Sequence, residues 1–341
     1  MAVTIKDIAV EMGITPSSVS KALNEKSDVS TDLKRKVRQV AQEMGYKKNM
    51  LAVRLVTMKS NTLGVFIFSR TKIRNSESTA YKYLNIMLNE AKKYGYDIVL
   101  FSIESSLSEN KSYIDLCRER QVEGALFIGF ENNDYHLEEL VHSGLPVVMI
   151  EKNISSENTG CVMVDNAGGI SLGMNYLFTL GHEKIAFIKG HFAAELSEIR
   201  FSQYRKMMEE KNIYSDRLVF EGDFSLESGY AVGLRISEMP ELPDAVFASN
   251  DLMAIGVIRA FSEKGIKIPD DISLIGFDNF EIGKYVQPKL TTIAQNFSDI
   301  AESAVTMIFN MINSGLHGRS VLLDPELIVR ESCAINKKYT D

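Results

Sequence analysis

Three hydrogen-bonding side chains near the N-terminus have a spacing that could serve nucleic-acid recognition. Ser17, Ser18 and Lys21 fall on the outer side of a short predicted helix, whereas Val19 and Leu23 lie four residues apart and would face a core. Hydroxyl and ammonium groups on an exposed helix can donate to phosphate oxygens or to acceptors on base edges. The alternative is that they are solvated polar residues of an ordinary three-helix bundle.

A second set of chemically capable side chains follows predicted strands in the rest of the chain. The set comprises Glu151, Arg200, Phe224, Asn250, Asp251 and Asp278. In open α/β sheets, ligands bind beyond the carboxyl ends of the strands, so these side chains could surround one ligand. Planar carboxylate, guanidinium and amide groups can each make two hydrogen bonds to neighbouring hydroxyls, while an aromatic ring covers an apolar face. The pattern therefore favours a sugar-like ligand.

Members of this second set also have purely structural interpretations. Asn250 and Asp251 precede a predicted helix and could cap it, an alternative that is stronger for Asp251 than for Asn250. Arg200 could form a surface ion pair, and the aromatic rings could belong to the core. Tyr81 and Tyr83 could line the same pocket, although helix packing explains them better.

Three short helices are predicted to position the first set, at about residues 5–12, 16–24 and 31–44. Thr4 with Asp7 fits a capping box, and Gly13 permits a tight turn after the first helix. Thr15 followed by Pro16 marks the next start, with a hydroxyl N-cap and a proline at the first helical position. Two short helices joined by a glycine turn, with a third closing the core, form helix-turn-helix geometry.

Charge separates this segment from the rest of the chain. Residues 1–60 contain 11 Lys and Arg against 6 Asp and Glu, a net charge of +5, whereas the remainder has a net charge of −12. Salt limits the reach of each exposed charge to about 8 Å, so the local field decides attraction to phosphate. The basic helical segment therefore indicates DNA binding.

From about residue 61, short apolar runs alternate with amphipathic stretches. The runs include LGVFIF, YDIVLFS, GALFIG, PVVMI, CVMV, KIAFI, DAVFA and ISLIGF. This alternation is typical of βαβ units, in which helices cover both faces of parallel sheets. About ten such units are too many for one small sheet. Two similar Rossmann-like lobes with a cleft between them are therefore expected.

Several classes of protein lack support in the sequence. There is no signal peptide pattern and no apolar run that could span a bilayer, so a cytoplasmic location is expected. Cys117, Cys161 and Cys333 are scattered singly, which indicates reduced thiols rather than disulfides or a zinc site. The sequence has no Walker loop, HExxH motif or nucleophile elbow, and DNAGGISLG lacks the G-x-G-x-x-G spacing. Neither an enzyme nor a bound cofactor or metal is expected.

Motifs in the same order over nearly the whole chain carry a family resemblance. They are TIKDIAVEMGITPSSVSKALN, VSTDLKRKVRQVAQEMGY, NTLGVFIF, VDNAGGISLGMNYLFTLGHEKIAFIKG, DAVFASNDLMAIGVIRAF, IPDDISLIGFDN and QPKLTTI. The chain resembles the lac repressor/galactose repressor family of bacterial transcription regulators. The resemblance implies base contacts by Pro16, Ser17 and Lys21. It also implies phosphate contacts, which would come from Thr4, Ser18, Ser20 and Asn24.

The resemblance also implies a hinge helix that folds against the minor groove. The implied contacts come from Asn49, Ala52, Arg54 and Leu55, with Leu55 as a wedge between base pairs. Family members commonly have proline then Ala-Arg in this stretch, whereas this chain reads Ala52-Val53-Arg54. The alternative for Leu55 is ordinary packing between domains.

The implied large domain is periplasmic-binding-protein-like, with an effector site between its lobes. The resemblance assigns Arg200, Asn250 and Asp278 to that site, with Phe224 and Phe297 as aromatic walls. Glu151, at the end of the predicted strand PVVMI, completes the expected set of six. Glu151 stands where many members have aspartate, and Gln203 replaces a common glycine. The chain is expected to cross between lobes near residues 162–165, 291–296 and 324–327.

These expectations combine into one domain plan. It has a helix-turn-helix domain at 1–48, a hinge at 49–60 and an effector and dimerisation domain at 61–341, with the N-lobe at about 61–162 and 294–325 and the C-lobe at about 163–291 and 326–341. We expect a homodimeric repressor of carbohydrate-utilisation genes that binds pseudo-palindromic operator DNA and is controlled by a sugar or sugar derivative. The alternatives are a sugar-binding module without DNA function, or a corepressor-dependent regulator that responds to a non-sugar ligand.

Overall fold

The computed structural model describes residues 3–46, 59–68, 79–103, 111–129, 136–154, 156–192 and 194–337. It divides the chain into two compact units, Met1–Ser60 and Asn61–Asp341. Asn49, Ala52, Arg54 and Leu55 lie outside the described residues, so the hinge contacts stay predictions. Among the described residues, no helix is long and apolar enough to cross a membrane.

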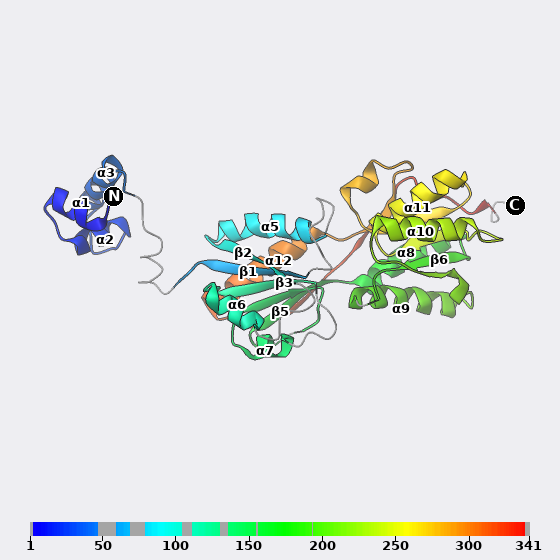
Figure 1. Ribbon diagram of the computed structural model, residues 1–341, viewed down its shortest axis with the longest axis horizontal. Helices are drawn as coiled ribbons and strands as arrows, with labels where there is room; N and C mark the ends of the chain where they lie inside the picture. Colours follow the sequence, from blue (N-terminus) through cyan, green and yellow to red (C-terminus); the bar gives the residue numbers. More distant parts are fainter. Residues whose placement is uncertain are drawn as a thin grey trace. The chain divides into compact units, whose positions relative to one another are not determined.

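The described part of the first unit contains three helices: α1 (Ile5–Met12), α2 (Pro16–Leu23) and α3 (Thr31–Glu43) (Figure 1). Ile8, Val19 and Val37, one from each helix, are fully buried in a common core. The predicted capping box of Thr4 is confirmed. The N-cap of α2 and its proline at the first turn are confirmed as well. These caps satisfy amide donors that the short helices would otherwise leave unpaired.

One sheet of the second unit is entirely parallel and has the strand order β11-β5-β4-β3-β1-β2. Its strands are β1 (Thr62–Phe68), β2 (Asp97–Ile103), β3 (Gly124–Ile128), β4 (Val147–Ile150), β5 (Thr159–Val164) and β11 (Ser320–Leu323). One face packs against α5 (Thr79–Lys93) and α12 (Phe297–Ser314), and the other against α6 (Tyr113–Glu119) and α7 (Leu137–His142). We call this sheet with its helices the N-lobe.

The other sheet has the strand order β12-β10-β9-β8-β6-β7. Its strands are β6 (Ile185–Lys189), β7 (Val219–Glu221), β8 (Ala245–Ala248), β9 (Ser273–Asp278), β10 (Thr291–Ala294) and β12 (Glu326–Ile328), and β12 runs antiparallel to β10. One face packs against α10 (Leu226–Ser237) and α11 (Asp251–Lys264), and the other against α8 (Asn166–Thr179) and α9 (Glu195–Glu210). We call this part the C-lobe. It also includes the short helices η2 (Asp216–Leu218) and η3 (Glu281–Lys284).

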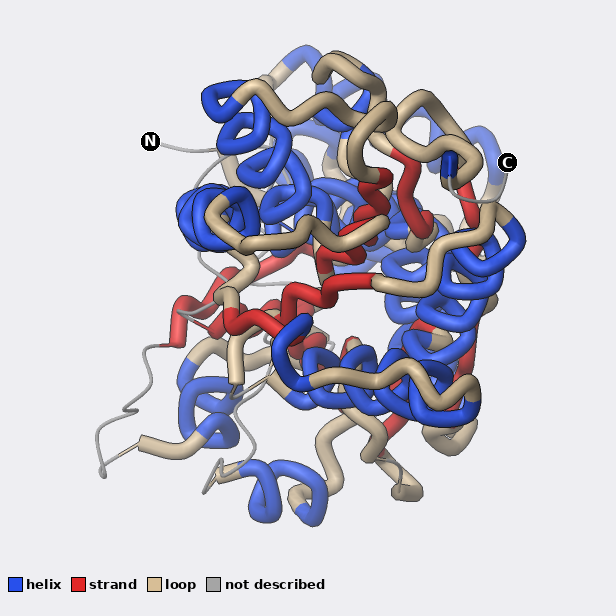
Figure 2. Tube along the Cα trace, turned by 90° about the vertical axis from the view of Figure 1, so that its right-hand side faces the viewer, coloured by secondary structure: helices blue, strands red, loops and turns tan. Residues whose placement is uncertain are grey.

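The two sheets share one strand order and differ in the direction of the edge strand, β11 or β12, and helices lie on both sides of the strands (Figure 2). In each, the first strand lies between the second and the third, which is the doubly wound arrangement that places a ligand site at the carboxyl ends of the central strands. The chain passes between lobes after β5, after β10 and after β11. The expected fold class, a helix-turn-helix head followed by a two-lobed α/β unit, is confirmed.

Candidate functional site

The exposed face of α2 carries the side chains predicted to contact bases. Pro16, Ser17 and Lys21 are exposed, because Val19 on the opposite side anchors the helix in the core. Lys21 Nζ donates to Asp28 Oδ2 at 2.5 Å, and this hydrogen bond lowers the pKa of the Asp28 carboxyl. An ion pair between two exposed side chains is weak, so an anionic or hydrogen-bonding partner can replace Asp28. The geometry leaves Lys21 available for the predicted role.

The residues predicted to contact phosphate differ in how they are held. Thr4 donates from both its N–H and its hydroxyl to Asp7 Oδ2, each at 2.8 Å, so it caps α1 while staying exposed. The hydroxyl of Ser18 lies 2.9 Å from the N-cap hydroxyl of α2. Asn24 Nδ2 donates to Ser20 Oγ at 3.5 Å. All four lie on the described surface of the first unit, and their contacts with DNA stay predictions.

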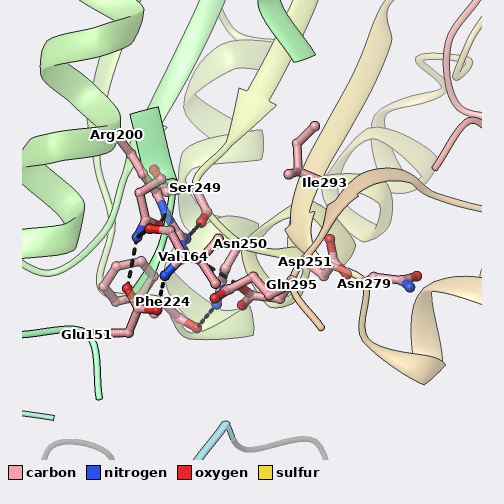
Figure 3. Close-up of polar contacts among 12 residues, drawn as sticks. Glu151, Val164, Arg200, Phe224, Ser249, Asn250, Asp251, Asn279, Ile293 and Gln295 are labelled. Carbon is pink, nitrogen blue, oxygen red and sulfur yellow. Dashed lines mark hydrogen bonds and ion pairs between the residues drawn. The ribbon is translucent and has the colours of Figure 1, made fainter. Parts of the chain in front are cut away.

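In the second unit, Arg200 is the centre of the predicted effector site (Figure 3). This α9 side chain is 2 % exposed, and its guanidinium carbon lies 3.6 Å from the centre of the Phe277 ring. Nε donates to Asn166 Oδ1 at 2.8 Å, and Nη1 donates to the Ser249 carbonyl at 2.5 Å. Nη2 lies 3.8 Å from Asp278 Oδ1. Burial lowers the pKa of Arg200, and the nearby carboxylates oppose that effect.

Glu151 joins the two lobes next to Arg200. It directly follows β4 of the N-lobe, and its Oε2 accepts a hydrogen bond from Asn166 Nδ2 of the C-lobe at 2.9 Å. Its Oε1 accepts from the Val164 amide at 3.0 Å. Burial raises the pKa of Glu151, while Val164 and Arg200 act in the opposite direction. The longer side chain at this position therefore reaches across to a C-lobe amide.

Asp278 ends β9 and faces the guanidinium of Arg200. Burial raises the pKa of Asp278 to about 6, even though Arg200, Gln295 and Lys82 favour its charged form. Gln295 Nε2 donates to Asp278 Oδ1. The site thus holds a buried carboxyl group that can titrate near neutral pH and either donate or accept a hydrogen bond.

Three of the six predicted effector residues have positive φ angles. The values are 59° at Glu151, 69° at Phe224 and 107° at Asp278. Residues other than glycine seldom adopt such backbone conformations, which cluster at ligand and active sites because the surroundings must hold them there. This strain marks the same strand ends that the sequence singled out.

Asn250, and not Asp251, caps α11, which is the reverse of the expectation. Asn250 is the N-cap of α11, with Oδ1 accepting from the Met253 amide at 2.9 Å, and its Nδ2 donates to the Phe224 carbonyl at 2.9 Å. Asp251 is fully buried and instead accepts from the Phe280 amide and from the Thr292 hydroxyl, each at 2.6 Å. The stronger capping expectation for Asp251 was therefore wrong. Its side chain instead turns inward to the two donors, the Phe280 amide after β9 and the Thr292 hydroxyl on β10.

Aromatic rings lie beside the polar residues. Tyr83 is buried in the N-lobe core and meets Phe297 edge-on at 5.3 Å between ring centres. Lys82 Nζ lies 4.3 Å from the centre of the Phe280 ring and 5.5 Å from that of Phe297. Burial raises the pKa of Tyr83, and the nearby carboxylates of Glu151 and Asp278 raise it further. Tyr83 is therefore both a core residue and a neighbour of the site. Tyr81 is 41 % exposed.

The structure adds residues that the sequence did not single out. Asn166 bridges Glu151 and Arg200, Ser249 supplies the carbonyl that holds Arg200, and Gln295 bonds Asp278. Each follows a strand, so the strand-end rule could have identified them. Within the described ranges, no group of three His, Cys, Asp or Glu side chains could hold a metal ion.

Comparisons with known proteins agree with the two-unit architecture. Residues 4–49 match bacterial regulatory proteins of the lacI family, and residues 174–333 match a periplasmic binding protein-like domain. The HTH-type transcriptional repressor PurR of Pasteurella multocida (strain Pm70) is 30% identical over 333 residues, which cover 96% of this chain and 98% of the relative.

Solved structures have the same fold. The structure described as the lac repressor dimer bound to operator and the anti-inducer ONPF has a TM-score of 0.82 at 24% identity, and the match covers 98% of this chain and 100% of that one. A LacI family transcriptional regulator from Enterococcus faecium with bound ribose has a TM-score of 0.71 at 24% identity, covering 81% of this chain and 100% of that one.

Proposed function

Because the chain belongs to the lacI family of bacterial regulatory proteins, it is a DNA-binding transcriptional repressor rather than an enzyme, and we propose that a small ligand held between its lobes controls that binding. The proposed site consists of Glu151, Arg200, Phe224, Asn250, Asp278 and Phe297. Asn166 is added to it because it links Glu151 to Arg200.

The gap between Arg200 and Asp278 is the observation that carries this proposal. Two guanidinium nitrogens of Arg200 are fixed by short hydrogen bonds, whereas Nη2 lies 3.8 Å from Asp278 Oδ1, beyond hydrogen-bonding distance. Both side chains are buried, so a polar ligand group inserted between them would bond two groups whose solvation has already been lost. A hydroxyl suits this position, and so does a ring N–H beside a carbonyl or an unprotonated ring nitrogen, because Arg200 donates and the Asp278 carboxylate accepts.

Two ligand classes fit a site of this kind. A sugar or sugar derivative would use its adjacent hydroxyls on Asp278 and Arg200, and one solved structure with the same fold contains ribose. A flat nitrogen heterocycle such as a nucleobase would use the same donor and acceptor edge and would stack on an aromatic ring. The name of the 30% identical relative, the HTH-type transcriptional repressor PurR, mentions no sugar, so a heterocycle is proposed beside a sugar.

We further propose that the protein acts as a homodimer in the cytoplasm. A solved structure with the same fold is a dimer bound to operator, and two helix-turn-helix heads would read the half-sites of a pseudo-palindrome. Pro16, Ser17 and Lys21 would contact bases, and Thr4, Ser18, Ser20 and Asn24 would contact phosphates. The residues proposed for the hinge remain Asn49, Ala52, Arg54 and Leu55.

A thermal-shift screen of the full chain tests the ligand proposal. D-ribose, cellobiose, adenine and guanine serve as probes, because a compound that binds the folded state alone raises the melting temperature. Asp278→Ala should abolish the shift and leave operator binding intact, whereas Asp270→Asn, an exposed acid in the same lobe, should retain the shift. A shift of unchanged size in Asp278→Ala would place the ligand elsewhere.

Operator binding is measured separately by fluorescence anisotropy. DNA selected from a random pool by the full chain is compared with unselected DNA at about 50 and 200 mM salt, a range over which phosphate contacts cause steep losses of affinity. Sedimentation of the protein–DNA complex gives the number of chains per operator. A single chain on a selected palindrome would contradict the dimer.

A further inference from the structure

Two consecutive residues at the end of β9 hold positive φ angles. The angle is 107° at Asp278 and 56° at Asn279, and neither residue is glycine. Such a turn persists only where its surroundings fix it, because each residue would relax to a more common conformation if released. A relaxed turn would also move the Asp278 carboxyl group away from Arg200.

Asp251, the first residue of α11, holds this turn through its carboxyl group. Its Oδ2 accepts from the amide of Phe280, the residue directly after the turn, and its Oδ1 accepts from the Thr292 hydroxyl on β10. Gly276 leaves room for this carboxyl, since a Cβ at that position would lie 2.3 Å from Asp251 Oδ1. The buried acid thus ties the turn to the neighbouring strand.

Arg330 holds the same turn through a side chain. Its Nη2 donates to Asn279 Oδ1 at 2.6 Å, and its Nη1 donates to the Leu290 carbonyl at 2.6 Å. Its own amide donates to the Thr291 hydroxyl at 2.9 Å. Arg330 follows β12, the strand that the chain forms after its last passage between the lobes. Its hydrogen bond therefore joins this C-terminal segment to a residue 51 positions earlier in the chain.

We propose that Asp251 and Arg330 are positioning residues that hold the Asp278–Asn279 turn in its strained conformation and so fix the Asp278 carboxyl group against Arg200. Neither needs to touch the ligand, because both act on the backbone and on Asn279. The inference rests on the proposed function, since a fixed Asp278 matters for binding only if Asp278 contacts the ligand.

Hydrogen exchange of the full chain, followed by mass spectrometry, tests the positioning role without any ligand. Arg330→Met should speed exchange in peptides covering residues 278–284 by at least about tenfold, because the change removes two hydrogen bonds from a charged donor, to Asn279 and to Leu290. Exchange in peptides from α8 should not change. Arg259→Met is the matched control, because Arg259 pairs with Glu263 on the exposed side of α11.

A double-mutant cycle separates action through Asn279 from general destabilisation. In an Asn279→Ala background, Arg330→Met should speed exchange by a smaller factor than in the wild-type background, because the bond to Asn279 is already lost and only the bond to Leu290 remains to be removed. Full additivity of the two changes would overturn the proposal. So would wild-type exchange in Arg330→Met.

Asp251 is tested with a conservative and a disruptive variant. In Asp251→Asn, the amide oxygen can still accept from the Phe280 amide while its nitrogen donates to Thr292, so exchange at 278–284 should stay within about twofold of wild type. Asp251→Ala removes both bonds and should resemble Arg330→Met. If Asp251→Ala does not fold, a rise of tenfold or more in the folded Asn variant would still contradict the assigned geometry.

Calorimetry with D-ribose and adenine gives the functional readout. Arg330→Met should weaken the probe that binds by about tenfold, and Arg259→Met should leave its affinity unchanged. Unchanged affinity in Arg330→Met would overturn the positioning role. If neither D-ribose nor adenine binds the wild type, the result contradicts the proposed ligand classes instead. The hydrogen-exchange result would still decide the role of Arg330.

Discussion

Replacing Asp278 by Asn should change how the stability of the second unit depends on pH. Asp278 is 5 % exposed, and burial raises the pKa of its carboxyl from 3.8 to about 6. A carboxyl whose pKa is higher in the folded state binds its proton more tightly there. Its contribution to stability is therefore complete below the unfolded pKa and is lost as the pH rises through the folded pKa.

The size of the effect follows from the two pKa values. Each pH unit between them is worth about 1.4 kcal/mol, so the rise from 3.8 to about 6 corresponds to about 3 kcal/mol of unfolding free energy. Glu151 and Asp251 also have raised pKa values, and they remain in the variant. The prediction therefore concerns the difference between variant and wild type: relative to wild type, Asp278→Asn should gain about 3 kcal/mol between about pH 4 and pH 7.

Urea unfolding followed by tyrosine fluorescence measures this difference. The chain has no tryptophan, and all of its 13 tyrosines except Tyr46 lie in the second unit, so the signal reports on that unit. Asp270→Asn is the control, because its carboxyl is exposed. The absolute stability of Asp278→Asn is not decisive, since the change also removes a charged neighbour of Arg200.

Parallel stability curves for the wild type and Asp278→Asn would refute the reasoning. They would mean that Arg200, Gln295 and Lys82 offset the cost of burying the charge completely. A larger loss in the variant as the pH rises would mean that these partners more than offset it, so that the folded pKa lies below the ordinary value.

Three further predictions concern the proposed interfaces. Lys21→Ala should reduce the preference for operator over random DNA by about 1–3 kcal/mol in anisotropy titrations, and an equal loss on both DNAs would limit Lys21 to phosphate contact. Gly190→Ala should weaken ligand binding in thermal-shift assays, because its Cβ would lie 1.9 Å from the Phe224 ring, and an unchanged shift would remove that ring from the site. Saturating operator DNA should change ligand affinity in equilibrium titrations, by the factor that linkage sets equal to the ligand's effect on operator affinity, and an unchanged ligand affinity would contradict control of DNA binding by the ligand.

Local chemistry explains why much of the fold was predictable. The caps at Thr4 and Thr15 and the glycine turn at Gly13 depend on residues three or four positions apart, and the structure has them as expected. Apolar runs gave the strands for a similar reason, because burial on both faces demands continuous apolar sequence. The antiparallel pairing of β12 with β10 follows a crossing between lobes and had no such local signal.

The orientation of side chains at the site was not predictable in the same way. Asn250 and Asp251 are neighbours of similar chemistry, and only the position of donors on β10 and after β9 decides which of them caps α11. The bond from Arg200 to Asn166 joins residues 34 apart, and the strained turn at Asp278 depends on Arg330. The ends of strands can be predicted from sequence, whereas the hydrogen-bond partners of the side chains at those ends depend on tertiary contacts.

The contacts of Arg200 also bear on how the protein would select its ligand. Exchanging one satisfied hydrogen bond for another contributes little net free energy, so Asn166 and the Ser249 carbonyl mainly hold the guanidinium in place. The wider separation between Nη2 and Asp278 is different, because a compound that fills the site without a bridging group would leave this buried pair without a hydrogen bond between its members, although Gln295 donates to Asp278 Oδ1. Selection should therefore depend on a donor and acceptor placed to bridge Arg200 and Asp278 more than on ring size, and sugars or heterocycles lacking that pair should be rejected even when they fit.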